Sequence, residues 1–447
     1  MTNWRTDATS NVDTQATPDA TTNVFFNTTT PAASFLTTNN LTTATSIASL
    51  TFTSAATGAV TIGNNGSNAN TLTIGAGGIT HSSSAGTSTL NVSVILGAAQ
   101  TWTNNSSNVL AVNGSTITGS GVNLTVAGTG DTTVGAAIQT GAGTVTKQGA
   151  GRLVFTGTNT NTGTTTVTGG NLQVGSGGTG SAASSAVTVS GTGSTTTTVS
   201  GVSGSPQATT PVLSAVKLDA PTLSGTGSVG AVTVGSLSTV GVLSPGDSGG
   251  ASPGTLTING TLTVYSGSQI QFGITSSSNN AMTIDASWDR SMTAATYLGI
   301  HATAGIGGTP DSIYTSWNTV NGTYSSLSLA GQALNLGSSS GGTPTVLVQT
   351  AGAASLAQGD IFKLLDWAAI SSGTAGSIGT PAGNSAFNVA SDLLLPDLGP
   401  TLSWDTSAFA LYGVVVIVPE PDRMVLMLFG LAVLFMRRRR TQTRSIG

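Results

Sequence analysis

Residues 143–175 read Gly143-Thr144-Val145-Thr146-Lys147-Gln148-Gly149-Ala150-Gly151-Arg152-Leu153-Val154-Phe155-Thr156-Gly157-Thr158-Asn159-Thr160-Asn161-Thr162-Gly163-Thr164-Thr165-Thr166-Val167-Thr168-Gly169-Gly170-Asn171-Leu172-Gln173-Val174-Gly175. Short runs in which Thr or Asn alternates with Val or Leu are separated by Gly and Asn. Alternation with a period of two is the signature of a half-buried strand. Gly and Asn supply the positive φ that tight turns require. This stretch therefore predicts four short strands, at 143–146, 152–155, 164–167 and 171–174.

The same pattern extends over about 240 residues, with further strands predicted at 59–63, 71–75, 109–114 and 122–126. Many short strands could form a sandwich, a barrel or a solenoid. The uninterrupted length favours a solenoid, as does an aromatic content of 5%. A charged content of 6% also fits, because identical charges in adjacent rungs would lie about 5 Å apart. We expect roughly 20–25 residues per rung and about ten rungs, or about 50 Å of shaft.

The composition bounds the class of protein. The chain has 447 residues, of which 38% are hydrophobic, so it can bury a core beneath a surface of Thr, Ser and Asn. It contains no Cys, which excludes disulfides, thiol catalysis and cysteine metal sites. Outside residues 419–447 the acidic residues outnumber the basic ones, so nucleic-acid binding is not expected. No cofactor or metal site is predicted.

We predict an all-β chain with four parts. A β-solenoid spans residues 1–264, a more irregular, decorated β region spans 265–344, and a C-terminal β cap spans 345–418. The cap is predicted from β patterns at 345–348, 361–365 and 411–418, where a solenoid needs its open end covered. A tail with one short transmembrane helix occupies residues 419–447.

The segments 143–159 and 162–175 together resemble the autotransporter-associated β-strand repeat, although Asn161 stands where that family usually has an aromatic residue. The resemblance covers about 33 residues and implies a right-handed parallel β-helix in an exported surface protein. The segments Leu243–Gly246 and Ser252–Ile258 resemble the sequence that commonly follows such repeats.

The tail has three consecutive parts: Val418-Pro419-Glu420-Pro421, an apolar run at 424–436, and the basic cluster Arg437-Arg438-Arg439-Arg440. Glu420 is the only glutamate in the chain. This layout resembles the PEP-CTERM sorting signal, which exosortase reads. The resemblance implies export, transient anchoring in the inner membrane, cutting near the Pro-Glu-Pro motif, and delivery to the cell surface or extracellular matrix, often with exopolysaccharide.

The physical properties of the tail agree with the orientation that this resemblance implies. The four arginines hold their end in the cytoplasm, so Pro419 to Pro421 face outward in an extended, protease-accessible segment. The apolar run of 13 residues is about 20 Å long, shorter than the roughly 30 Å core of a bilayer. Snorkelling arginines and local thinning can absorb this mismatch.

The beginning of the chain, Met1 to Asp7, shows neither the basic nor the apolar region of a signal peptide. We expect a truncated or misassigned start. The alternative is a fragment that is not exported.

Three further patterns suggest chemistry. Gly246–Gly250 spells the sequence around a trypsin-like nucleophile, and Gly175–Gly180 spells a dinucleotide fingerprint, but both lack the partners that these sites require and are interpreted as turns. The cluster Asp285, Asp289 and Asp311 with His301 leaves a rival hypothesis open, a β-helical polysaccharide lyase or glycoside hydrolase that uses Asp289 beside Trp288 and Arg290.

A self-secreting autotransporter is rejected, because residues 345–447 are too short for a membrane barrel.

The sequence thus predicts an exported, non-catalytic protein with a structural or adhesive role. Its expected partners are an exosortase-type enzyme, the inner membrane transiently through residues 424–436, and exopolysaccharide as neighbour or ligand.

Overall fold

The computed structural model describes most of the chain outside the N-terminus, the tail and one long central segment. The described residues are 18–27, 37–41, 43–64, 70–175, 180–182, 185–191, 199–200, 212–213, 220–246, 253–276, 323–324, 326–329, 332–338, 344–350, 356–357, 360–366, 377–399 and 402–419.

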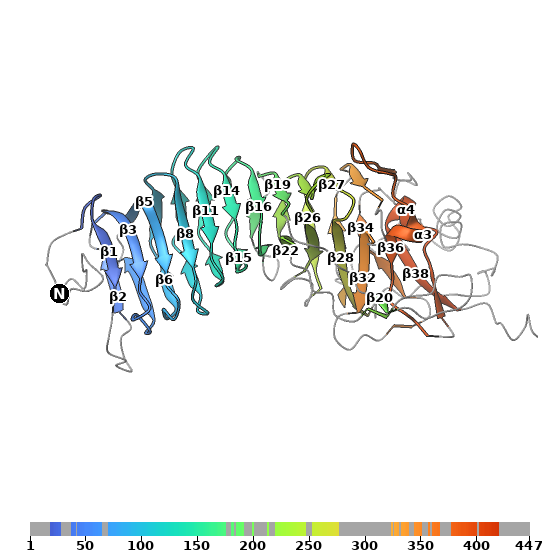
Figure 1. The fold of residues 1–447 in the computed structure, drawn as a ribbon, viewed down its shortest axis with the longest axis horizontal. Helices are drawn as coiled ribbons and strands as arrows, with labels where there is room; N and C mark the ends of the chain where they lie inside the picture. Colours follow the sequence, from blue (N-terminus) through green and yellow to red (C-terminus); the bar gives the residue numbers. More distant parts are fainter. Residues whose placement is uncertain are drawn as a thin grey trace, which may run out of the picture.

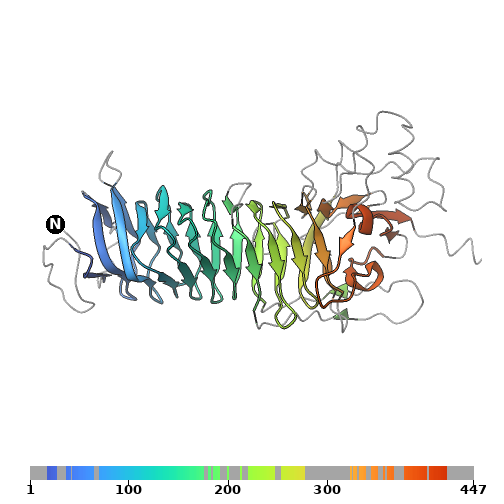
Figure 2. The ribbon, with the colours of Figure 1, turned by 90° about the horizontal axis from the view of Figure 1, so that it is seen from above.

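The chain coils so that consecutive strands enter three different ladders. Strands β9, β10 and β11 form one turn, and β12, β13 and β14 follow and pair with them in the same order, always in parallel. This arrangement is a three-faced parallel β-solenoid, and the stacked rungs make an elongated shaft (Figures 1 and 2). The prediction of a solenoid is confirmed, whereas its right hand remains a prediction.

Face A runs from the N-terminal to the C-terminal end of the shaft. It contains β1 (Asn23–Phe26), β3 (Thr45–Phe52), β5 (Thr71–His81), β8 (Gln100–Asn104), β11 (Leu124–Ala127), β14 (Val145–Lys147), β16 (Thr165–Val167), β19 (Val187–Val189), β24 (Val232–Val234), β27 (Leu262–Val264), β31 (Leu334–Leu336) and β35 (Ile378–Gly379).

Face B runs beside it. It contains β2 (Thr37–Leu41), β4 (Val60–Asn64), β6 (Ser88–Leu90), β9 (Leu110–Val112), β12 (Thr132–Val134), β15 (Arg152–Phe155), β17 (Asn171–Val174), β22 (Thr222–Gly225), β25 (Val242–Pro245), β28 (Gln269–Ser276), β32 (Val346–Thr350) and β36 (Leu393–Leu394).

Face C begins with the first halves of β3 and β5, which bend between faces C and A. It continues through β7 (Ser93–Leu96), β10 (Thr116–Thr118), β13 (Ala137–Gln139), β18 (Ser181–Ala182), β23 (Ser228–Val229), β26 (Thr255–Ile258), β30 (Ser326–Ser328) and β34 (Leu365–Asp366). Two small antiparallel contacts accompany the shaft: β20 (Val199–Ser200) pairs with β21 (Val212–Leu213), and β29 (Thr323–Tyr324) pairs with β28.

The register reports the length of a rung. On face A, Leu124 lies opposite Val145, Val145 opposite Thr165, and Thr165 opposite Val187. The separations are 21, 20 and 22 residues, within the predicted 20–25. Later rungs of the same face are longer, with 45 residues from Val187 to Val232 and 72 from Leu262 to Leu334. All four strands predicted between 143 and 175 are present as β14 to β17.

Alternation sends one set of side chains inward and leaves the other on the surface. In β11, Leu124 and Val126 are buried while Thr125 is half-buried, and β19 repeats the pattern with Val187, Thr188 and Val189. Each buried Val or Leu contributes about 1.5–3 kcal/mol relative to an exposed one. Among the described residues, Trp102 in β8 is the largest of the fully buried side chains.

The ladders continue across residues 265 and 345, which were the predicted domain boundaries. On face A, β27 pairs with β31 and β31 with β35; on face B, β28 pairs with β32 and β32 with β36. A different arrangement closes the C-terminal end, where β33 (Ile361–Lys363), β38 (Val414–Pro419) and β37 (Leu402–Asp405) form an antiparallel sheet. Two one-turn helices accompany it, α3 (Val389–Asp392) and α4 (Phe409–Tyr412), so Leu411 lies in a helix rather than in the predicted strand.

Candidate functional site

The first half of the predicted sorting motif lies at the end of the C-terminal sheet. Strand β38 contains Val418 and Pro419, whose backbones lie opposite Ser403 and Leu402 of β37. The preceding residues, Val414 to Ile417, are fully buried. The motif therefore begins in the last two residues of a strand that is anchored in the folded body.

The remaining parts of the tail lie outside the described residues: Glu420, Pro421, the apolar run 424–436 and the cluster Arg437 to Arg440. Within the described part of the chain, no helix combines the length and apolar character needed to span a bilayer.

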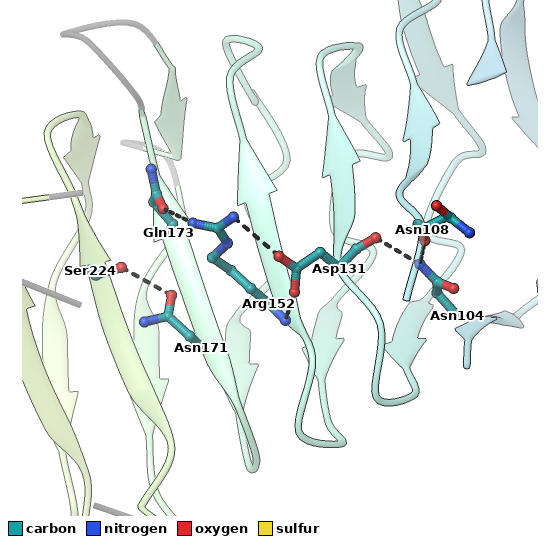
Figure 3. A network of polar contacts seen from close by, with 7 residues as sticks. All are labelled: Asn104, Asn108, Asp131, Arg152, Asn171, Gln173 and Ser224. Atoms are coloured by element: carbon teal, nitrogen blue, oxygen red, sulfur yellow. Dashed lines mark hydrogen bonds and ion pairs between the residues drawn. The ribbon is translucent and has the colours of Figure 1, made fainter. Parts of the chain in front are cut away.

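A polar column crosses adjacent rungs where face A turns into face B (Figure 3). The carboxylate of Asp131 accepts a hydrogen bond from the backbone N–H of Arg152 at 2.9 Å and forms an ion pair with its guanidinium at 3.1 Å. Arg152 also donates to Oε1 of Gln173, one rung further, at 3.3 Å. Charges of opposite sign thus occupy neighbouring rungs. Like charges at this spacing would repel each other.

The column is extended on both sides by amide and hydroxyl groups (Figure 3). Nδ2 of Asn104 donates to the carbonyls of Asn108 and Asp131, at 3.0 and 2.7 Å, and its Oδ1 accepts from the backbone N–H of Ser106. The same Oδ1 lies 2.7 Å from Nδ1 of the buried His81. At the other end, the hydroxyl of Ser224 donates to Asn171 at 2.9 Å.

Lys147 lies on the inside of the corner where face A turns into face B, and only 2% of its surface is exposed. In the alternation of β14, Val145 and Lys147 both point inward, so the aliphatic stem of Lys147 is stacked between Val126 and Val167. Its Nζ donates to the carbonyls of Gln148, Gly149 and Gly169 at 2.9, 2.8 and 3.3 Å. Burial lowers the pKa of Lys147 to about 8, and the nearby charge of Asp131 acts in the opposite direction.

The groups at this corner are already engaged with one another. The ammonium of Lys147 has three donors and faces three carbonyls, so its bonding capacity is filled inside the shaft. The carboxylate of Asp131 is occupied by two groups of Arg152. We conclude that the corner holds successive rungs in register. This role is not evident from the sequence pattern, although Lys147 and Arg152 are among only six basic residues before position 419.

Of the other sequence motifs that suggest chemistry, one is partly described by the structure and the rest lie largely outside the described residues. After Gly180 the chain enters strand β18 rather than the helix that a dinucleotide fingerprint requires, whereas residues 176–179 lie outside the described residues and their interpretation as a turn stays a prediction. Asp247 to Gly250 lie outside the described residues, and so do Asp285, Asp289, Asp311, His301, Trp288 and Arg290. Among the residues that the structure describes, no group of three potential metal ligands comes together.

Replacing Asp131 with Ala should destabilise the protein by about 1 kcal/mol, because the pair is partly exposed and the N–H of Arg152 loses its acceptor. It should also lower the pKa of Lys147 further, because Asp131 is the charge that raises it. Asp131→Asn, which keeps an oxygen acceptor, is the control and should cost less. Urea unfolding midpoints measure both variants, and equal losses in the two would contradict the role given to the acceptor.

Comparison with known proteins identifies a repeat in the segment that contains Lys147 and Arg152. Residues 145–174 match the passenger-associated-transport-repeat family. The match comprises β14 to β17 and confirms the β-strand repeat predicted at about 143–175. No curated protein and no solved structure matches the chain.

The fold and the repeat together define a class of protein. The chain is an all-β, parallel-stranded solenoid that carries a repeat of exported passenger proteins. This repeat indicates a secreted, passenger-like protein, exported or displayed on the cell surface, and the repeat family is not known for catalysis.

Proposed function

We propose that the protein is a non-catalytic component of the cell surface or extracellular matrix, sorted by an exosortase through its C-terminal tail and associated with exopolysaccharide. The passenger-type repeat at 145–174 is the observation that supports export. The three-part tail supports the proposed sorting step, because its motif, apolar run and basic stop follow one another in the order that such a signal requires.

The fold suits a structural or adhesive role. Its surface is supplied by half-buried Thr and Asn side chains on an elongated shaft with few charges. Such a surface offers many weak hydrogen-bonding contacts in a regular series, and weak contacts that act together can hold a polymer firmly.

The position of β38 supports processing of a folded body. The strand is paired with β37 as far as Pro419, so the ladder ends inside the motif. We propose that the enzyme acts on the chain immediately after this strand, while the apolar run 424–436 holds the protein in the inner membrane. The folded body is then released intact to the surface.

Replacing Glu420 and Pro421 together with Ala should leave the protein uncut and retained in the membrane fraction of a host that carries an exosortase. These two residues lie beyond β38, so the folded body is expected to remain unchanged. Asp422→Ala, the next position along the chain, serves as the control and should be processed like the original. Immunoblots of membrane, surface and medium fractions measure the outcome. Release of the double variant at the rate of the control would refute sorting through the motif.

A further inference from the structure

Face A carries an unbroken column of polar side chains on its outer surface. Along the ladder, the outward residues of successive strands lie directly opposite one another, and each is Thr until the final Asn. The column consists of Thr101, Thr125, Thr146, Thr166, Thr188, Thr233, Thr263 and Asn335. Neighbouring strands place these hydroxyls about 4.8 Å apart.

The hydroxyls in the middle of this column are unused by the protein. Among the described residues, those of Thr125, Thr146, Thr166, Thr188 and Thr233 have no hydrogen-bond partner, and all five side chains are half-buried. Some hydroxyls of face C bond to one another instead. On face C, Ser181 bonds to Ser228 at 3.0 Å and Thr255 to Ser326 at 2.7 Å, from one rung to the next.

A second outward column lies two residues upstream on the same face and contains only small, uncharged side chains after Asn123. Backbone hydrogen bonds hold it in the same register, for example from Val145 to the carbonyl of Thr164 at 3.2 Å and from Val232 to that of Thr261 at 3.0 Å. Its members are Asn123, Thr144, Thr164, Ala186, Ala231, Thr261 and Ala333. Face A thus presents hydroxyl and methyl groups in two parallel lines, and neither line contains a charge.

Face B provides the contrast. Its outer residues include the ion pair of Asp131 and Arg152, and the outward positions Val154, Gln173, Ser224 and Ser244 are all less than one-tenth exposed. The outward threonines of face B, Thr61, Thr89 and Thr133, are interrupted by Ala111 and followed by Val154. The longer unbroken line of hydroxyls is therefore that of face A.

We propose that the threonine column of face A, from Thr125 to Thr233, binds a neutral polysaccharide chain that lies extended along the shaft. Absence of charge removes any attraction for acidic polymers, which would require Lys or Arg. Free hydroxyls can donate to and accept from sugar hydroxyls, while the Thr methyls contact the sugar C–H groups. The repeat of the rungs is close to the length of one hexose unit in an extended chain, so successive rungs can contact successive sugars.

This inference rests on the proposed function and names the ligand class and the face that serve it. The test uses the full chain in mild detergent and native affinity electrophoresis through gels with hydroxyethylcellulose, a neutral polymer, or alginate, an acidic one. The test variant is Thr146→Val/Thr166→Val/Thr188→Val, which removes three hydroxyls, keeps the side-chain shape and retains residues that favour strands. The matched control is Thr61→Val/Thr89→Val/Thr133→Val, three outward threonines of face B.

The original chain and the control should be retarded by hydroxyethylcellulose but not by alginate, and the face A variant should bind at least about tenfold more weakly. Equal binding by the two variants, retardation by alginate alone, or no retardation by either polymer would overturn the proposal. Loss of self-association in the face A variant, measured by light scattering without polysaccharide, would instead assign the column to a second copy of the chain. Binding is measured on purified protein and sorting in cells. Failure of the binding proposal therefore leaves the sorting proposal standing, and failure of the sorting proposal leaves the binding proposal standing.

Discussion

Gly149→Ala is expected to destabilise the shaft by about 2–4 kcal/mol. Gly149 has a φ of +76°, in the left-handed region that disfavours a side chain. An added Cβ would also lie 2.5 Å from the carbonyl oxygen and 2.7 Å from the nitrogen of Gly128, in the adjacent rung. Both contacts are with backbone, so neither can be relieved by a change of rotamer.

Two control variants separate the causes of this loss. Gly141 has a φ of +61° but open space around its added Cβ, so Gly141→Ala reports conformational strain alone, about 1 kcal/mol. Gly58 has neither a positive φ nor a contact, and Gly58→Ala should be nearly neutral. Urea unfolding followed by circular dichroism gives the three values. A loss for Gly149→Ala no larger than that for Gly141→Ala would show that the rungs are not stacked as closely as described.

Lys147 is expected to make the protein more stable as the pH rises from about 8 to about 10.5. Burial places the pKa of Lys147 at about 8 in the folded protein, below its ordinary value of 10.5. Between these values the unfolded chain binds more protons than the folded one, so the free energy of unfolding increases with pH. The full gain is on the order of 3 kcal/mol.

Lys147→Met isolates this contribution, because Met keeps most of the aliphatic packing between Val126 and Val167 but cannot titrate. The difference in unfolding free energy between the original chain and this variant should move in favour of the original by about 3 kcal/mol from pH 7.5 to pH 10.5. Lys363→Met, the same change at the lysine paired with Asp366, controls for the loss of a positive charge. Parallel pH profiles for the original chain and Lys147→Met would contradict the buried position of the amine.

Much of the shaft could be predicted from local pattern. Alternation and Gly spacing located the strands between 143 and 175, and the rung length followed from them, because each rung is built from neighbouring residues. Period two also places Lys147 on the same side as Val145, and His81 on the same side as Ile79. That signal was available, but it does not show which carbonyls meet Nζ, because Gly169 belongs to the next rung.

The ends of the predicted parts were harder to place. The sequence between 265 and 344 looks irregular, yet β28, β30 and β31 continue the three ladders. Short strands of three residues carry little local signal, and their identity is fixed by pairing with rungs far away in the chain, as for Thr255 and Ser326. The same holds for Pro419, whose place in β38 depends on Leu402 rather than on its neighbours.

The central claim, that the body is sorted through its tail and released, is tested most directly by the intact mass of the surface product. The full-length chain is produced in a host that carries an exosortase, and the surface and medium fractions are weighed by mass spectrometry. We predict a product that keeps β38 and ends near Pro419 to Pro421, without the apolar run 424–436 and the cluster Arg437 to Arg440. A surface product that still contains residues 422–447 would contradict the account.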